Sequence, residues 1–348
     1  QAVGAFAERV RARIRQLDEV PAASGALTVS IGVHLFDPDD RGPADALNHA
    51  EQALSRAKQG GPGGFALFAR GMQADAEARL RLAADLRLGL AAGEIHAHFQ
   101  SKCRADGRIV GAEALARWFH PTRGLVSPME FIKTAEEIGQ VSEITRIVLN
   151  KACREAMAWP DEVAVSVNLS AMDLTRPDIL HVIGKALETS GLPAERLQVE
   201  VTETVFVSDM DQAKTILGSL RDLGVKIALD DFGTGYSSLS YLSDLPLDKV
   251  KIDKSFIKQI GQDEKADSIL GATVQLARVA GYQVVVEGVE RQDQLDAINR
   301  ITKVDLVQGW LYGQPASSSA LKTQIATTNG ARDGKIIDIN ANRHGATR

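Results

Sequence analysis

The sequence predicts an α/β fold, a (β/α)8 barrel of the TIM type preceded by part of a small α+β domain. From about residue 93 to 322, eight short β-rich runs alternate with helical patterns. This alternation implies parallel strands and right-handed crossovers, and eight strands in roughly 230 residues fit a barrel better than an open sheet. The full length of 348 residues also suggests two domains rather than one.

The beginning of the chain predicts part of a separate α+β domain. Residues 1–17 have the pattern of an amphipathic helix and contain the acidic Glu8 but no continuous apolar core, which argues against a signal peptide. Residues 26–36 and 64–69 predict strands, and residues 44–61 between them predict a helix that ends in glycine. This order is that of a fragment rather than of a whole domain.

Changes in composition along the chain set the expected domain boundaries. We expect the α+β part at 1–72, a linking helix rich in leucine and arginine at 73–92, the barrel at 93–322 and a tail at 323–348. The tail is polar with one short apolar island, so we expect it to be mostly disordered.

Short runs rich in β-branched residues predict the barrel strands. They are 96–102, 108–118, 163–170, 197–203, 226–231, 249–253, 283–288 and 304–309. Between them, Ser127 and Glu130 have the spacing of a capping box, with proline at the first helical position. Two later helical patterns end at Gly224 and Gly281.

The composition of the chain limits the classes of function that it can have. The chain has 40 basic and 45 acidic residues, a net charge of −5, which argues against a surface that binds nucleic acid polymers. A small anionic ligand held by a few local cations stays compatible with this charge. The sequence contains no run of 18 apolar residues, so no membrane span is predicted in it. Cys103 and Cys153 lack metal-site or redox spacing, so we expect two buried thiols in a reducing compartment.

Almost every expected barrel strand ends in an oxygen donor or a cation. In chain order these residues are Glu113, Asn168, Glu200, Asp230, Asp231, Lys251, Glu287 and Gln308. In a barrel of this kind the carboxyl ends of the strands converge on one face, where the site is built. We therefore expect these side chains to meet there.

The donors are carboxylates and one amide, which suit Mg²⁺ or Mn²⁺, or Ca²⁺, whereas zinc normally recruits histidine or cysteine. The adjacent Asp230 and Asp231 make sense if one carboxylate bridges two ions and the other completes the ligand set of the second ion. Two ions ~3.5–4 Å apart clamp both oxygens of an in-line phosphoryl displacement. Gly233 and Gly235 would then let the next loop settle over a phosphate.

Each of these signals also has a plainer interpretation. A lone Gly-x-Gly often serves turn geometry, and adjacent aspartates at a strand end can cap the next helix. Lys251 alone could be a solvated lysine and Asn168 a turn residue. The hypothesis depends on the whole set falling at one end of the barrel.

Seven ordered blocks resemble a known family. They are "GAEALARW" (111–118), "NLS" (168–170), "EVTET" (200–204), "DDFGTGYSSLSYL" (230–242), "KVKIDKSFI" (249–257), "VVEGVE" (285–290) and "QGWLYGQP" (308–315). Together they cover essentially all of residues 93–320 and resemble the EAL family of bacterial phosphodiesterases, which hydrolyse cyclic di-GMP to linear pGpG. The family fold is a modified barrel with one antiparallel strand at its start, which argues against a parallel strand at 96–102.

The resemblance implies roles for the site residues. Glu113, Asn168, Glu200 and Asp230 would hold one metal ion, and Asp230 would bridge to a second ion that Asp231 also binds. The ions would be Mg²⁺ or Mn²⁺, with Ca²⁺ inhibitory. Among residues assigned to the chemistry, Lys251 and Glu287 would position and deprotonate the attacking water, and Glu203 would anchor the loop after Asp231.

The resemblance also implies substrate contacts, and Arg117 would meet a phosphate of cyclic di-GMP. Gln100 and Leu115 would contact the substrate, and Glu290 and Gln308 would lie near a guanine or near the part of the site that faces a dimer partner. Mild departures from the family pattern, such as Ser101 and Phe119 (where the family usually has proline and arginine), remove no metal ligand.

The N-terminal segments "LTVSIGVHLF", "ADALNHAEQALSRAKQGG" and "FALFARGM" resemble the C-terminal half of a GGDEF domain, the diguanylate cyclase fold. Its signature loop is absent from these residues, so we do not expect this chain to make cyclic di-GMP. The resemblance further implies a homodimer formed through the EAL domain. It also implies a bacterial cytoplasmic location, either alone or as the cytoplasmic part of a longer sensor.

Two other functions compete with hydrolysis. The first is a non-catalytic cyclic di-GMP receptor, although degenerate receptors of this kind typically lose metal ligands and this chain loses none. The second is another Mg²⁺-dependent barrel enzyme, such as an enolase-type proton abstractor. The second alternative explains the carboxylates and the lysine but not the "EVTET" and "DDFGTGYSS" blocks.

Overall fold

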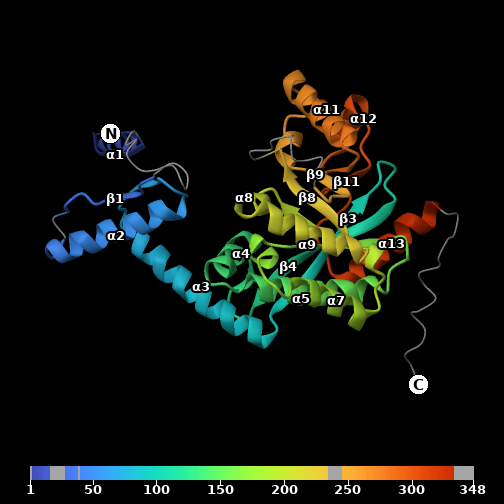
Figure 1. The fold of residues 1–348 in the computed structure, drawn as a ribbon, viewed down its shortest axis with the longest axis horizontal. Helices are drawn as coiled ribbons and strands as arrows, with labels where there is room; N and C mark the ends of the chain where they lie inside the picture. Colours follow the sequence, from blue (N-terminus) through green and yellow to red (C-terminus); the bar gives the residue numbers. More distant parts are fainter. Residues whose placement is uncertain (1, 16–27, 38–39, 234–244, 333–348) are drawn as a thin grey trace. The chain divides into compact units, whose positions relative to one another are not determined.

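The computed structural model divides into two compact units, residues 1–84 and residues 85–348. Figure 1 shows both units as ribbons coloured along the chain. The described residues are 2–15, 28–37, 40–233 and 245–332. Each unit has a sheet of its own, and the two are described separately here.

The first unit alternates helices and short strands. Its elements are α1 (Ala2–Arg15), β1 (Ile31–Val33), α2 (Pro43–Gln59) and β2 (Phe65–Leu67). β1 and β2 lie parallel with Ile31 opposite Phe65, so α2 is the crossover between them. The strands are shorter than the sequence predicts, because only three residues of each form the ladder.

The helix expected to follow is α3 (Met72–Ala92), and the division between the two units falls within it. Eight strands of the second unit then form a closed barrel. They are β3 (Ile95–Cys103), β4 (Ile109–His120), β6 (Ala164–Asn168), β7 (Leu197–Thr202), β8 (Lys226–Phe232), β9 (Lys249–Ile252), β10 (Gln283–Val286) and β11 (Leu306–Gln308). β3 pairs with both β11 and β4, which closes the ring, and β5 (Gly124–Val126) adds a hairpin to β4.

The first barrel strand runs against the others. β3 pairs antiparallel with β4, where Gln100 lies opposite Glu113, and antiparallel with β11, where Lys102 lies opposite Gln308. From β4 through β11 the barrel pairings are parallel. The expectation of parallel strands throughout is therefore wrong for residues 96–102, as the family resemblance implies.

Helices lie outside the strands of the barrel (Figure 1). They are α4 (Pro128–Glu137), α5 (Val141–Ala156), α6 (Ala171–Leu174), α7 (Ile179–Ser190), α8 (Val205–Ser208), α9 (Met210–Asp222), α11 (Glu264–Val279), α12 (Gln292–Ile301) and α13 (Ser318–Arg332), with 3-10 turns η1 (Ala194–Arg196) and η2 (Lys254–Ile257). α9 and α11 end just before Gly224 and Gly281, as predicted, and both glycines have positive φ. None of the helices described is long and apolar enough to cross a membrane.

The start of α4 corrects one expectation. Pro128 occupies the first helical position as predicted, but the side chain of Ser127 makes no capping hydrogen bond. The capping box predicted for Ser127 and Glu130 is therefore wrong, although the helix begins where the pattern placed it. A proline at this position sets the helical backbone angle without a capping side chain.

The barrel core is built from β-branched and aliphatic side chains of successive strands, and α5 covers it from outside. Val165, Val167 and Val199 are almost completely buried. Cys103 and Cys153 are both buried and unbridged, as expected. Burial raises the pKa of the Cys153 thiol to about 12, so this side chain acts as an inert apolar group.

The end of the chain is more ordered than its composition predicts. α13 continues to Arg332, with Leu321 and Ile325 buried against the barrel. The side chain of Asn329 accepts a hydrogen bond from the backbone nitrogen of Ile109 and donates one to its oxygen, both at 2.9 Å. Disorder from residue 323 is therefore wrong as far as residue 332, and residues 333–348 lie outside the described part of the chain.

Candidate active site

Polar side chains from successive strands meet at the carboxyl end of the barrel. The register brings them together, because Asn168 at the end of β6 lies opposite Glu200 on β7, and Asp230 on β8 lies opposite Thr202. Glu287 follows β10 directly, with its backbone nitrogen bonded to the oxygen of Ile252. The expectation that the strand ends converge is met by these positions.

Lys251 on β9 lies at the centre of this group and is 1% exposed. Its ammonium nitrogen lies 2.5 Å from Glu200 Oε2, 2.7 Å from Glu287 Oε1 and 3.0 Å from Asp230 Oδ1. A fourth carboxylate, that of Glu113, lies 3.5 Å away. Burial by itself would lower the pKa of Lys251, but these four carboxylates raise it well above its usual value.

Glu200 is completely buried between two lysines. Lys251 contacts one carboxylate oxygen, while Lys102 contacts the other, which also accepts a hydrogen bond from Gln198 at 2.8 Å. Burial favours the neutral acid, and the two ammonium groups outweigh it, so the pKa of Glu200 falls below its usual value. Glu200 is therefore a fixed anion in the floor of the site.

Glu113 on β4 is positioned by two amides. Asn168 Nδ2 donates to its Oε1 at 2.7 Å, and Gln308 Nε2 donates to its Oε2 at 2.7 Å. Gln308 also donates to Gln100 Oε1 at 3.3 Å. These bonds hold the Glu113 carboxylate in one orientation beside Lys251.

Two other carboxyls, those of Asp230 and Glu287, have pKa values that are raised rather than lowered. Burial raises the pKa of Asp230 to about 6, and the nearby charges of Glu200 and Glu113 add to the effect while Lys251 opposes it. Burial likewise raises the pKa of Glu287 to about 8, helped by Asp230 and Glu113. The two lysines that contact Glu200 together cannot neutralise this many buried carboxylates, so the site is short of positive charge.

The carboxylates fall into two triplets whose oxygens lie within 4.8 Å of one another. The first is Glu113, Glu200 and Asp230, and the second is Asp230, Asp231 and Glu287. Asp230 belongs to both. These donors are all oxygens, the ligands that Mg²⁺ and Mn²⁺ prefer, so the residues present fit divalent metal binding.

The backbone around Asp231 is irregular. The pairing of β8 with β9 shifts register between Leu229 and Phe232, and Asp231 has a φ of 55°, in the left-handed region. Two residues later, the nitrogen of Gly233 donates to Glu203 Oε1 at 3.1 Å. The predicted anchoring of Phe232–Ser238 by Glu203 is thus seen at its first residues, and residues 234–238 lie outside the described part.

A cavity of ≈ 250 Å³ opens over the carboxylates. Of the predicted site residues, its lining includes Gln100, Glu113, Leu115, Asp230, Lys251, Glu287, Glu290 and Gln308. The Oε1 atom of Gln308 is buried and has no hydrogen-bond partner among the described residues. Arg117 lies half-buried on β4 and donates to the oxygen of Ala116 at 2.8 Å, and burial lowers its pKa.

Several residues of the site were not predicted. Lys102, which contacts Glu200 and Ser166, follows Gln100 by two positions on β3 and so points to the same side. That alternation of polar residues in "HFQSKC" was the available signal. Lys254 and the exposed Trp310 also line the cavity. Both lie shortly after a strand, and no pattern in the sequence marks them as site residues.

Fold and site define a barrel protein that gathers carboxylates and a lysine from several strands at the mouth of one cavity. The model of the EAL domain family matches residues 83–315, and the chain belongs to this family. The match covers the barrel and the end of α3, and it leaves most of the first unit outside.

Named relatives are similar over most of the chain. The bifunctional diguanylate cyclase/cyclic di-GMP phosphodiesterase MucR of Pseudomonas aeruginosa is 35% identical over 326 residues, 92% of this chain and 47% of its own length. The cyclic di-GMP phosphodiesterase NbdA of the same organism is 36% identical over 322 residues, 91% of this chain and 41% of its own length. This chain spans about half or less of the length of such curated relatives.

A solved structure titled as the PaMucR phosphodiesterase in complex with c-di-GMP is also similar. It is 37% identical, with a TM-score of 0.66, and covers 69% of this chain and 99% of its own. The FimX EAL domain from Pseudomonas aeruginosa bound to c-di-GMP is 26% identical, with a TM-score of 0.62 over 68% of this chain and 96% of its own.

Proposed function

We propose that this chain hydrolyses cyclic di-GMP to linear pGpG. The observation that carries the proposal is Asp230, shared by two triplets of carboxylate oxygens at the mouth of one cavity. A shared carboxylate can bridge two divalent ions ~3.5–4 Å apart, the spacing of a two-metal site. Relatives named as cyclic di-GMP phosphodiesterases, and similar structures titled as complexes with this dinucleotide, identify the substrate.

In this proposal the two ions are Mg²⁺ or Mn²⁺. Glu113, Asn168, Glu200 and Asp230 would hold the first ion, and Asp230 would share the second ion with Asp231. When bound, the pair supplies Lewis-acid stabilisation to the attacking and leaving oxygens of an in-line displacement. The two triplets and the oxygen-only donor set support these assignments.

Glu287 is proposed to accept a proton from the attacking water. Its oxygen lies 2.7 Å from the Lys251 ammonium, which would orient both the carboxylate and the water. A base whose pKa lies near the working pH transfers protons efficiently, and the raised pKa of Glu287 suits this role. Attack would break one phosphodiester bond and leave a 5′-phosphate and a free 3′-hydroxyl.

The same cavity would take the substrate. The buried Oε1 of Gln308 could accept a hydrogen bond from a guanine, since no described residue donates to it. Gln100, Leu115 and Glu290 line the same space and would contact the dinucleotide. Arg117 would meet a phosphate, because its guanidinium keeps its charge even when half-buried.

A direct assay of products tests the proposal. The chain is mixed with cyclic di-GMP in Mg²⁺, Mn²⁺, Ca²⁺ or chelator, and the products are separated by chromatography. We expect pGpG in Mg²⁺ and Mn²⁺, and none in chelator or in Ca²⁺, whose longer bonds and looser geometry align the water poorly. Full activity in chelator would contradict the two-metal mechanism.

A variant separates hydrolysis from the alternative of a non-catalytic receptor. Glu113→Ala removes a charged metal ligand, and we expect turnover to fall by at least ~10²-fold while the fold persists. Binding of cyclic di-GMP in Ca²⁺, measured by calorimetry, together with no turnover of the parent in any metal would instead support the receptor.

Three further features belong to the proposal. We infer that the first unit is the C-terminal part of a GGDEF domain, since the alignment with MucR covers 92% of the chain, beyond the EAL match. We also expect a homodimer formed through the EAL domain, which light scattering would test. A cytoplasmic location follows from the substrate, which is an internal messenger of bacteria.

A further inference from the structure

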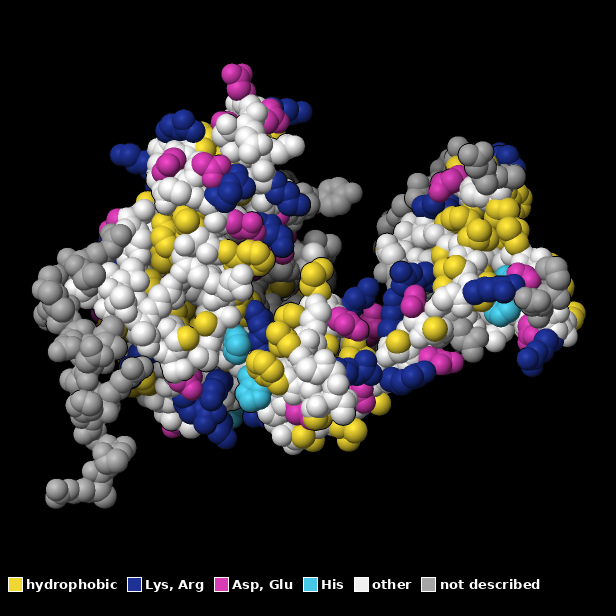
Figure 2. Space-filling view, turned by 180° about the vertical axis from the view of Figure 1, so that it is seen from behind, with side chains coloured by type: hydrophobic (Ala, Val, Ile, Leu, Met, Phe, Trp, Pro, Cys, Tyr) yellow, Lys and Arg dark blue, Asp and Glu magenta, His cyan; other side chains and the backbone are white. Residues whose placement is uncertain are grey.

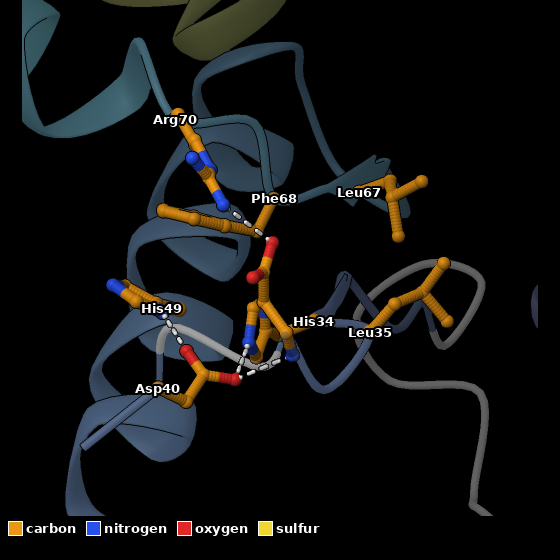
Figure 3. A pocket seen from close by; sticks show the side chains of 8 residues that line it. His34, Leu35, Asp40, His49, Leu67, Phe68 and Arg70 are labelled. Atoms are coloured by element: carbon orange, nitrogen blue, oxygen red, sulfur yellow. Dashed lines mark hydrogen bonds and ion pairs between the residues drawn. The ribbon is translucent and has the colours of Figure 1, made fainter.

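The first unit contains a second cluster of metal-ligating side chains, unlike the one in the barrel. Its members come from three segments: His34 directly follows β1, Asp40 lies in the loop before α2, and His49 lies on α2. One ligand atom from each lies within 4.8 Å of the other two. Figure 3 shows the two imidazole rings pointing at the carboxylate of Asp40.

The carboxylate of Asp40 lies between the two rings and uses both its oxygens. Oδ2 lies 2.7 Å from His34 Nε2, and Oδ1 lies 3.0 Å from His49 Nδ1. The side chains of Asp40 and His34 are 1% and 7% exposed, while that of His49 is 24% exposed. The group is thus nearly enclosed but open on the side of His49.

Neighbouring residues hold the three ligands in place. Phe68 stacks on His49 with ring centroids 4.1 Å apart, and meets His34 edge-on at 5.1 Å. The backbone nitrogen of Asp37 donates to Asp40 Oδ2 at 2.7 Å, which fixes the carboxylate. Such supporting contacts orient the ligands of metal sites and raise their affinity.

We propose that His34, Asp40 and His49 bind one divalent transition-metal ion of the Zn²⁺ class. Two imidazole nitrogens and a carboxylate oxygen are the donors that zinc prefers, and three protein ligands leave a fourth position for water. The barrel site offers oxygens alone and would favour Mg²⁺. The chain would then carry two metal sites that differ in ligand chemistry.

The open position faces a cavity of ≈ 420 Å³ that these residues line together with Leu67, Phe68 and Arg70. Within the first unit, Figure 2 shows a histidine side chain at the surface among basic and acidic groups. An ion can therefore enter without unfolding of the unit. Arg70, which pairs with Asp37 at 2.9 Å, brings positive charge to the rim of the cavity.

The plainer alternative is a carboxylate hydrogen-bonded by two histidines, with no metal. In that arrangement each facing ring nitrogen carries a proton. Metal binding needs the facing nitrogen unprotonated, and a neutral imidazole achieves this when its proton moves to the other ring nitrogen. The two arrangements therefore differ in metal stoichiometry and in the coordination of the bound ion, both of which can be measured.

The test titrates Zn²⁺ into the full chain with Mg²⁺ in excess to occupy the barrel. We expect one further equivalent of Zn²⁺ to bind. Co²⁺ in place of Zn²⁺ should give the intense visible absorption of a four-coordinate ion, which a six-coordinate ion at an all-oxygen site does not give. Absence of an additional equivalent would overturn the proposal.

Variants locate the ion. His49→Ala and the isosteric Asp40→Asn should each weaken this Zn²⁺ binding at least ~10-fold and remove the Co²⁺ absorption. His181→Ala is the matched control, because His181 is exposed on α7 and should change neither. Circular dichroism verifies that each variant folds. An unchanged Co²⁺ spectrum in both folded cluster variants would place the ion elsewhere and refute the site.

Discussion

Lys251 offsets part of the negative charge of the barrel site. Its buried ammonium lies within 3.5 Å of four carboxylates, from β4, β7, β8 and the end of β10. Burying several carboxylates without a nearby cation is costly, because each loses its hydration. Lys251 therefore contributes to the fold as well as to the proposed chemistry.

We expect Lys251→Met to lower the free energy of unfolding in chelator by about 3 kcal/mol or more, since it leaves buried charges unpaired. Added Mg²⁺ should restore part of the loss by supplying positive charge at the same place. Urea unfolding with and without Mg²⁺ measures both effects. Lys185→Met, at an exposed position on α7, is the matched control. Equal stability of the two variants in chelator would contradict this role.

Metal affinity at the barrel should rise with pH. Burial and neighbouring carboxylates raise the pKa of Asp230 to about 6 and that of Glu287 to about 8. Below those values protons occupy the carboxylates and compete with a cation, so affinity increases as pH rises through them. Calorimetry in buffers of different ionisation enthalpy should detect proton release at pH 7. An affinity that is constant from pH 6 to 8 would show that neither group titrates there.

At the scale of residues, the sequence predicted the carboxylates better than their partners. Glu113, Glu200 and Asp230 could be predicted as site residues because strand ends in a barrel share one face. Lys102 could not be predicted in this way. It lies on β3, the barrel strand that runs in the opposite direction, so the carboxyl end of this strand does not meet those of the other strands. The pairing of Glu200 with two lysines depends on tertiary contacts that no local pattern encodes.

Among the elements, β7 and β8 are joined beyond their ladder by Glu203 and Gly233. This bond holds the backbone two residues after Asp231, whose φ of 55° is uncommon for residues other than glycine. The contact thereby supports the position of Asp231, a proposed ligand of the second ion.

Glu203→Ala should raise the Mg²⁺ concentration needed for half-maximal rate by roughly tenfold, since hydrogen bonds to charged groups contribute about 1.5–3 kcal/mol. Glu203→Gln keeps an oxygen that can accept from Gly233 and should lie close to the parent. A Mg²⁺ titration of the hydrolysis rate compares the three proteins. Superimposable curves for the alanine variant and the parent would mean that Asp231 is positioned without Glu203.

The last helix, α13, was the element hardest to predict from the sequence. α13 is polar on most positions, and its place in the fold depends on Leu321, Ile325 and the side chain of Asn329. Asn329 satisfies both backbone groups of Ile109 at the start of β4. Asn329 forms hydrogen bonds with the backbone of a strand that is distant in the sequence. From the residues next to it in the sequence alone, it looks like an ordinary polar surface residue.

Asn329→Ala should therefore destabilise the barrel by about 1–3 kcal/mol, because two buried backbone groups lose their partner. Thr327→Ala on the exposed side of α13 should have little effect. Thermal unfolding compares the two, and hydrolysis at low temperature should be the same in both. A loss of activity without a loss of stability would contradict this account.

At the scale of the whole molecule, two units with separate sheets should unfold separately. We expect calorimetry to show two transitions, with Zn²⁺ raising one and Mg²⁺ together with cyclic di-GMP raising the other, because a ligand stabilises only the unit that binds it. One transition that responds to both metals would show that the units unfold together.

The overall architecture could be predicted because a barrel repeats one simple pattern. Strand and helix alternate at regular intervals, and several helices end near a glycine, as at Gly224 and Gly281. The reversal of β3 breaks this pattern, and its own residues give no sign of direction, since a strand looks alike read either way. Only the family resemblance indicated it.

That reversal also determines where the chain enters the barrel. In an all-parallel barrel the first strand begins at the end opposite the site, whereas Ile95 at the start of β3 pairs with Trp118, beyond Glu113 on β4. The indole of Trp118 donates to Glu94 at 2.8 Å, so the residue just before β3 is tied to the neighbour of Arg117. The chain therefore enters the barrel at the same rim as the proposed site, and the contact between Glu94 and Trp118 lies beside Arg117 rather than at the opposite end of the core.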